Sequence, residues 1–328
     1  MSTAAAAKDH VANPLFGFVS VRLNTLHSVK TSVVDVFVQY EPHSPPVLYC
    51  RAGYDLDPEH FAELADAGIE NVHIRNNDFD HFGSDLLESI ESYLHREGVS
   101  PSDKFSALQV AVAVEIEHAL RTVDCGIIHS LTEKIGRQLV GLLAASDVLP
   151  RDLFRIARHD FSTFTHITNV ASYSVILAES LGVRDREELE QIATGALLHD
   201  VGKRFIPTAI LTKPGRLDPE EREICESHPK RGYLELCGRP GLNFGQLMMV
   251  YQHHEHIDGT GYPVRILGDE IHPWAKLLTV ADVFDAMTAS RPYRRPDSAE
   301  SVLAYLRRQA GTHFDPEVVE CWITAMSK

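Results

Sequence analysis

The segment HHEHIDGTGYP, residues 253–263, combines three histidines and two acidic residues with a glycine-rich turn. Histidine is the commonest metal ligand among side chains, and glycines at this spacing indicate a loop. Taken alone, His253-His254 beside Glu255 is equally typical of a solvated surface. A Tyr-Pro pair such as Tyr262-Pro263 often only packs over a helix end. The segment therefore predicts a metal site only if other candidate ligand residues lie elsewhere in the chain.

Further candidate ligands lie in the same half of the chain. Asp282 lies in an apolar helical stretch, where burial of an unpartnered carboxylate is costly. His199-Asp200 ends an amphipathic pattern over residues 187–198, and Gly202 supplies an end for that helix. Lys203 follows, where an ammonium could meet a phosphate oxygen. The candidate ligands are His166, His199, Asp200, His228, His253, His254 and Asp282.

These residue types favour a particular chemistry. Mixed imidazole and carboxylate ligands suit Fe, Mn, Ni or Zn, whereas a calcium site would be all oxygen. A carboxylate can also bridge two ions. Two adjacent ions suit phosphodiester hydrolysis, because they neutralise the phosphate, activate water and stabilise the leaving oxygen.

Composition excludes several classes of protein. The formal net charge of −15 argues against a protein that coats DNA or RNA, since such proteins are normally basic. The five cysteines are scattered and form no C-x-x-C pair, which argues against a disulfide scaffold or zinc ribbon and fits a reducing compartment. We find no signal-peptide core and no apolar stretch near the roughly 20 residues of a membrane span. We expect a cytoplasmic protein.

The chain of 328 residues is long enough for two domains. Residues 1–13 are Ala-rich and predicted to be disordered. Strands are expected at 33–40, 47–50 and 71–74, and helices at 57–67 and 83–95, which together predict a small α/β module over residues 1–100. Residues 101–148 are expected to form a helical connector, and residues 149–328 an all-helical domain. The predicted fold class is mainly α.

The motifs of the C-terminal half resemble the HD-GYP domain, a branch of the HD metal-dependent phosphohydrolases. The resemblance runs from roughly residue 151 to the C-terminus. Its most specific part is the segment 253–263, in which every signature position is filled. The other matching motifs are LHDVGK (198–203), KPG (213–215), His228-Pro229 with Gly232, ADVFDAMT (281–288), RPYR (291–294) and FDP (314–316).

The resemblance implies a helical fold with a metal centre that hydrolyses cyclic di-GMP to linear pGpG, and possibly on to GMP. It assigns all seven candidate ligands to the metals, with Asp200 as the bridging carboxylate. Lys203 would face phosphate, and we expect it to stabilise developing charge there. Asp285 lies three residues from Asp282 on the same helix face, so it could orient a ligand, assist proton transfer or have a structural role alone. The remaining substrate contacts would come from Gly261, Tyr262, Pro263, Arg291 and Arg294.

Two positions depart from the family pattern. Members with three metals carry a glutamate one helical turn before the first histidine, where this chain has Ser162. A serine hydroxyl is a poor ligand for a divalent cation, so we expect two ions, with Fe or Mn favoured over Ni or Zn. Arg294 stands where many members have lysine, which keeps the charge and changes its geometry.

Two alternatives stay open from the sequence. The scaffold could act on another cyclic dinucleotide or on a nucleotide. It could also serve as a cyclic di-GMP receptor of low turnover, which the missing third-metal carboxylate favours. The N-terminal module and the connector are candidates for homodimer formation or for binding a signalling protein.

Overall fold

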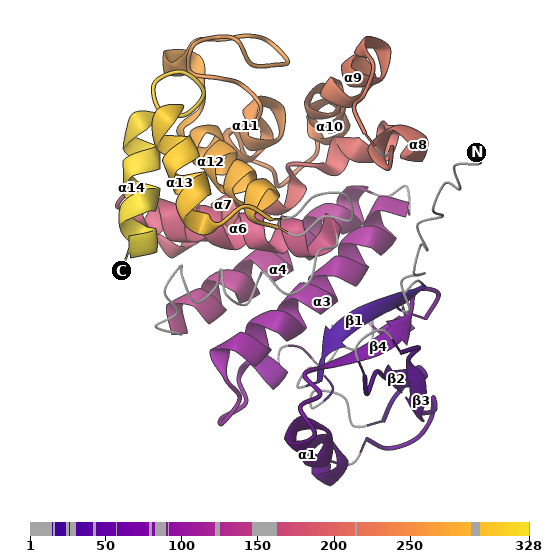
Figure 1. The fold of residues 1–328 in the computed structure, drawn as a ribbon. Coiled ribbons are helices and arrows are strands. Elements are labelled where there is room, and N and C mark those ends of the chain that lie inside the picture. The colour runs from indigo at the N-terminus through magenta and orange to yellow at the C-terminus, as the bar shows by residue number, and fades with distance from the viewer. Residues whose placement is uncertain are drawn as a thin grey trace, which may run out of the picture. The chain divides into compact units, whose positions relative to one another are not determined.

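The computed structural model describes residues 17–23, 31–41, 44–56, 58–78, 92–121, 125–145, 163–213, 215–289 and 296–327, together with Leu15, Leu26, His81, Phe82 and Ile90. The chain divides into two compact units, Met1–Ser89 and Ile90–Lys328. The first contains a small sheet and the second is helical, as Figure 1 shows. The expectation of a mainly α fold with a small N-terminal α/β module is confirmed. The finer division at residues 100 and 148 stays a prediction.

The sheet of the first unit has four strands in the order β1-β4-β2-β3, and every pairing is antiparallel. Alternating apolar residues bury one face of it, with Val36, Val38, Val72 and Ile74 fully buried. Its elements are β1 (Phe18–Arg22), β2 (Val36–Val38), β3 (Val47–Cys50), α1 (Pro58–Asp66) and β4 (Asn71–Arg75).

Most of the expected N-terminal elements are present. The strand expected at 33–40 is shorter, and β1 was not predicted. The helix expected at 83–95 and the predicted disorder of residues 1–13 lie largely or wholly outside the described residues.

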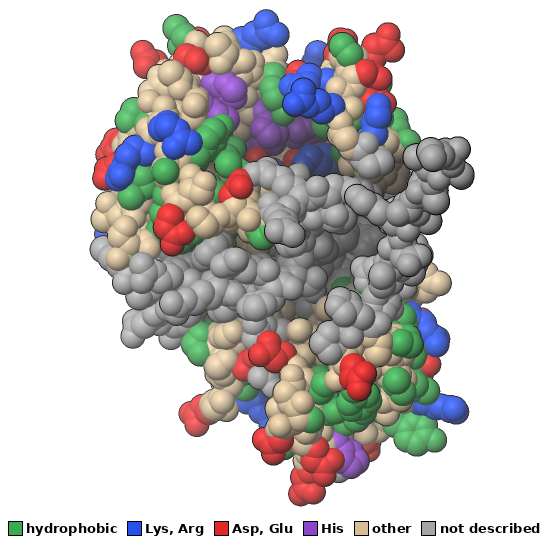
Figure 2. Space-filling model, in the orientation of Figure 1, with side chains coloured by type: hydrophobic (Ala, Val, Ile, Leu, Met, Phe, Trp, Pro, Cys, Tyr) green, Lys and Arg blue, Asp and Glu red, His purple; other side chains and the backbone are tan. Residues whose placement is uncertain are grey.

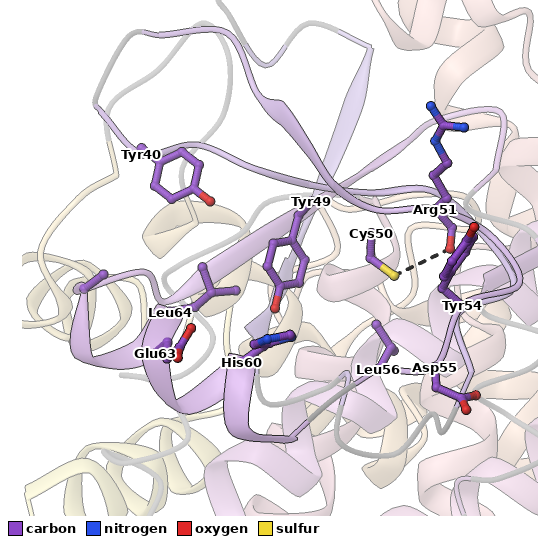
Figure 3. A pocket seen from close by; sticks show the side chains of 11 residues that line it. Tyr40, Tyr49, Cys50, Arg51, Tyr54, Asp55, Leu56, His60, Glu63 and Leu64 are labelled. Carbon is purple, nitrogen blue, oxygen red and sulfur yellow. Dashed lines mark hydrogen bonds between the residues drawn. The ribbon is translucent and has the colours of Figure 1, made fainter.

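An open cavity of about 710 Å³ lies within the first unit, beside β3 and α1 (Figure 3). Tyr40, Tyr49 and Tyr54 contribute aromatic rings to its lining, and His60 and Leu64 of α1 form its floor in that view. Cys50 Sγ donates a weak hydrogen bond to the carbonyl oxygen of Arg51 at 3.5 Å.

The second unit is built from helices of about one to six turns. Among the helices that the structure describes, none is long and apolar enough to cross a membrane. The elements are α3 (Pro101–Arg121), α4 (Cys125–Ala145), α6 (Thr163–Ser180), α7 (Arg186–Leu198), η2 (Val201–Phe205), α8 (Thr208–Leu211), α9 (Pro219–Glu226), α10 (His228–Leu236), α11 (Phe244–Gln252), η3 (Gly268–Glu270), α12 (Pro273–Thr288), α13 (Ala299–Arg308) and α14 (Pro316–Ser327).

Helix α7 lies at the centre of this unit, packed against α4, α6 and α11. Helix α12 packs against α6 and α11, and α10 packs against α11 and η2. An aromatic cluster joins α6, α12 and α14, because the rings of Tyr173, Phe284 and Trp322 lie 5.1–5.6 Å apart and are fully buried. This packing fixes the helices that carry His166 and Asp282.

Gly202 has a different role from the predicted helix end. Helix α7 already ends at Leu198, and Gly202 lies inside η2 without a positive φ. A Cβ atom at this position would lie 1.9 Å from the carbonyl oxygen of His228 and 2.7 Å from the amide nitrogen of Gly232. Glycine is therefore required because η2 packs directly on the backbone of α10.

Replacing Gly202 by alanine should destabilise the chain by about 1–3 kcal/mol, the usual cost of overpacking. The added methyl group forces η2 away from His228. Urea unfolding followed by circular dichroism measures the change.

Gly141→Ala is the matched control, since its Cβ would meet only a guanidinium nitrogen of Arg186 at an ordinary 3.5 Å. Alanine in the interior of α4 should be neutral or stabilising. Equal stability of the Gly202→Ala chain and the wild type would contradict the close packing.

Candidate metal centre

Helix ends bring most of the candidate ligands together. His199 is the C-cap of α7 and Asp200 follows it, His228 begins α10, and His253 is the C-cap of α11 with His254 next to it. His166 and Asp282 project from α6 and α12, which pack against each other. Apart from His254, which is half-buried, all of these side chains are buried.

The ligand atoms form two groups that could each hold a cation. One consists of His166, His199 and Asp282, and the other of His228, His253 and His254. Within each group the ligand atoms lie within 4.8 Å of one another.

Asp200 lies between the two groups. Its Oδ2 is 3.4 Å from His199 Nε2, and its Oδ1 is 3.3 Å from His228 Nε2 and 3.9 Å from His253 Nε2. This is the position that a bridging carboxylate would need.

The backbone fixes the tautomers of three histidines. The Nδ1 atoms of His199, His228 and His253 lie 2.7 Å from Ala196 O, 2.8 Å from Cys225 O and 3.0 Å from Val250 O, respectively. A carbonyl oxygen can only accept, so each Nδ1 carries the proton and donates. Each Nε2 is then left with a lone pair that points into the site, as a metal ligand requires.

Within the part of the chain that the structure describes, these lone pairs have no proper partner. His199 Nε2 and Asp200 Oδ1 are buried and accept no hydrogen bond. His228 Nε2 and His253 Nε2 lie 3.2 Å apart, with two acceptors facing each other. Buried acceptors without donors are costly, and divalent cations in the two groups would satisfy all four. The residues present therefore fit divalent metal ions.

His166 is held between two carboxylates. Its Nδ1 lies 2.7 Å from Asp285 Oδ2, and its Nε2 lies 3.2 Å from Asp282 Oδ1. Burial alone would lower the pKa of His166, but the hydrogen bonds to Asp282 and Asp285 raise it to about 10. Burial would raise the pKa of Asp282, but the hydrogen bond and the charge of His166 hold it below its usual value.

Charge in the second group is arranged differently. Burial, together with neighbouring imidazoles, keeps the pKa of His253 well below its usual value, and burial lowers that of His254 to about 3. Both rings are therefore neutral at pH 7, which metal binding requires. Burial would raise the pKa of Asp200, but Lys203 and His199 hold it well below its usual range.

Lys203 forms an ion pair with Asp200 Oδ2 through its Nζ atom. Its side chain is partly exposed, which places Lys203 at the edge of the ligand groups. Lys203 thus lies beside the candidate ligand groups, and its contact with a phosphate stays a prediction.

The loop at residues 261–263 is held against the second group. The Tyr262 ring centroid lies 4.7 Å from that of His254, and Tyr262 N donates to His254 O at 3.0 Å. A Cβ at Gly261 would lie 2.3 Å from His256 N, so only glycine allows this close return of the chain.

Glu255 anchors the far side of the same loop. The sequence alone was equally typical of a solvated surface around Glu255, and the structure shows that this side chain is buried. Its carboxylate accepts from Val264 N at 2.6 Å and from Arg265 N at 3.0–3.1 Å.

Asp285 belongs to a buried chain of polar side chains that the sequence did not predict. Its Oδ1 accepts from Asn169 Nδ2 at 3.0 Å, and Asn169 Oδ1 accepts from Gln109 Nε2 at 2.6 Å. These hydrogen bonds thus connect Gln109 of α3, Asn169 of α6 and Asp285 of α12 to His166. Asp285 contacts the imidazole of His166, and its role in orienting a ligand stays a prediction.

Three predicted positions, Ser162, Arg291 and Arg294, lie outside the described residues.

On the face shown in Figure 2, histidine side chains gather in a recess of the second unit with lysine and arginine side chains beside them. Asp315 caps α14 by accepting from Glu317 N at 3.0 Å, as expected for a helix cap.

Comparison with known proteins agrees with this arrangement. A family model described as an HD domain matches residues 150–318, about half of the chain. The chain belongs to the HD domain family. The resemblance to its HD-GYP branch, drawn from the motifs, is confirmed.

Curated relatives match the same half. The chain is 38% identical over 174 residues to the cyclic di-GMP phosphodiesterase response regulator RpfG of Xanthomonas campestris, covering 51% of this chain and 46% of that protein. It is 39% identical over 160 residues to the 3′3′-cGAMP-specific phosphodiesterase 2 of Vibrio cholerae, covering 48% of this chain and 30% of that protein. The chain therefore spans less than half the length of either relative.

A solved structure shares the fold over nearly the whole chain. This is an HDG"Y"P protein from Bdellovibrio bacteriovorus, with a TM-score of 0.66 and 18% identity, covering 95% of this chain and 100% of that one.

Asn169→Leu should weaken metal binding by about 10- to 100-fold, the usual effect of losing a residue that orients a metal ligand. The change removes the donor to Asp285 and leaves the Gln109 amide unpaired. Calorimetric titration of the metal-free chain with Mn²⁺ measures the affinity.

Ser172→Ala is the control, because Ser172 lies on the same helix and its hydroxyl donates only to Thr168 O. It should lose stability at most, with unchanged metal affinity. If Asn169→Leu binds Mn²⁺ as tightly as this control, the chain of polar side chains does not position His166.

Proposed function

We propose that the chain is a metal-dependent phosphodiesterase that opens cyclic di-GMP to linear pGpG. The observation that carries the proposal is the pair of histidine-rich groups on either side of Asp200, with buried acceptors that no donor in the described chain satisfies. The names of the relatives support a cyclic dinucleotide as the substrate class.

Two divalent ions are proposed, one in each group, with Asp200 shared between them. His166, His199 and Asp282 would hold the first, and His228, His253 and His254 the second. Fe or Mn is favoured, with Ni or Zn as the other choices for this ligand set. When bound, such ions supply Lewis acidity toward phosphate and water.

The chain's own residues provide the rest of the chemistry. Lys203 keeps its charge, since the pairing with Asp200 raises its pKa against the effect of burial, and it would stabilise negative charge that develops on the phosphate. The Tyr262 ring would lie along the nucleotide beside His254. Asp285 would keep His166 in the tautomer and orientation that ligation needs. Arg291 and Arg294 remain predicted phosphate or guanine contacts.

A second candidate substrate is 3′3′-cGAMP. Relatives specific for it match this chain at the same level of identity as the cyclic di-GMP relatives. The two substrates differ in one base, so the metal and phosphate contacts would be shared. The N-terminal unit remains a predicted regulatory or dimerisation module.

Asp200→Ala should abolish metal loading and reduce turnover by at least about three orders of magnitude, because both proposed ions lose a shared ligand. Metal content by mass spectrometry and pGpG formation from cyclic di-GMP measure the two effects. Asp269→Ala, an exposed acid in η3, is the control and should keep both. Normal turnover by Asp200→Ala would rule out this centre.

A substrate panel tests the choice of dinucleotide. The Mn- and Fe-loaded chain should hydrolyse cyclic di-GMP faster than 3′3′-cGAMP, with pGpG as the first product, and chelation should remove both activities. Faster cleavage of 3′3′-cGAMP would reverse the substrate choice. Tight binding of cyclic di-GMP by the loaded chain without any product would instead define a receptor.

A further inference from the structure

A second cavity of about 690 Å³ lies in the helical unit and shares no residue with the metal centre. Its lining comes from the segment before α3, the first turn of α3, the second half of α4 and the first residue of α7. The volume is within the range of small-molecule sites in proteins.

The charge of this cavity is opposite to that of the chain. The chain carries a formal charge of −15, yet the described lining includes the basic side chains of Lys104, Lys134, Arg137 and Arg186 and no acidic residue. Lys134 and Arg137 are three residues apart on α4, so they project from the same face, where like charges repel. An anion between them would relieve that repulsion.

The cations are available to a ligand. Among the described residues, Lys104, Lys134 and Arg137 form no ion pair. Arg186 is held by Glu190 through its Nε atom at 2.9 Å, and one terminal nitrogen lies over Gly141, which also lines the cavity.

The other lining groups point to more than a bare anion. Leu94 and Leu142 add apolar wall. Cations beside an apolar wall match a phosphate that is joined to a planar base.

We propose that this cavity binds a nucleoside monophosphate. The phosphate would lie between Lys134, Arg137 and Lys104, and the base against Leu94 and Leu142. The cavity is too large for inorganic phosphate alone, and the overall negative charge disfavours a nucleic-acid polymer. The inference stands independently of the reaction at the metal centre.

The site has a direct structural connection to the metal ligands. Arg186 is the first residue of α7, and the same helix ends immediately before His199-Asp200. Thirteen residues of α-helix span about 20 Å, so the ligand would bind at the opposite end of one rigid element.

Equilibrium dialysis with radiolabelled GMP and AMP tests the proposal. At least one nucleotide should bind to the Asp200→Ala chain, in which the metal centre is disabled. Lys134→Glu/Arg137→Glu in that background should weaken binding by tenfold or more, because the substitutions replace two exposed cations beside the phosphate with anions. Binding should also weaken as salt concentration rises.

Arg307→Glu/Arg308→Glu on α13 is the matched control, with the same change in charge on exposed residues outside the cavity. It should bind like its parent. If Asp200→Ala does not fold, the stoichiometry on the metal-loaded wild type gives the answer, since the α4 double variant should bind one equivalent fewer.

Three results would overturn the proposal. The first is the absence of GMP and AMP binding outside the metal centre. The second is equal binding by the α4 double variant and the α13 control. The third is competition by inorganic phosphate as strong as that by the nucleotides, which would assign the cavity to free phosphate.

Discussion

Asp200 is a buried carboxylate surrounded by imidazole nitrogens that present lone pairs rather than protons. Such a cluster is unfavourable without positive charge, since each buried acceptor loses its hydrogen bonds to water. Lys203 offsets only one oxygen of the carboxylate. The rest of the helical unit can be understood as the scaffold that keeps these acceptors facing one another. Its aromatic core fixes α6 and α12, and the contact of Gly202 with His228 fixes η2 against α10.

The arrangement also separates two kinds of support. Local backbone carbonyls hold His199, His228 and His253, whereas side chains from other helices hold His166. Glu255 plays the equivalent part for the loop at residues 261–263, because its carboxylate binds the backbone just beyond that loop. The loop and the second ligand group are therefore fixed to each other before any ligand is present.

Sequence reasoning predicted the helical fold and named candidate ligands that the structure brings together, because these signals are local. Adjacent pairs such as His199-Asp200 and His253-His254 can be read without knowing the packing. The hydrogen-bonded link from Gln109 through Asn169 to Asp285 could not be predicted from the sequence. A buried amide in a helix is indistinguishable from any other polar residue until α3, α6 and α12 are packed together. Strand β1 was missed for a similar reason, because its pairing partner β4 lies about fifty residues away.

The carbonyl hydrogen bonds of the three histidines have a further consequence. In each case the carbonyl lies three residues before the histidine, in the last turn of a helix. The orientation of each ring is thus fixed by one local hydrogen bond, and it is kept as long as that helical turn is folded. His166 instead depends on Asp285, which lies 119 residues further along the chain. The orientation of His199, His228 and His253 is therefore encoded by residues close to them in sequence, whereas that of His166 requires the intact tertiary fold.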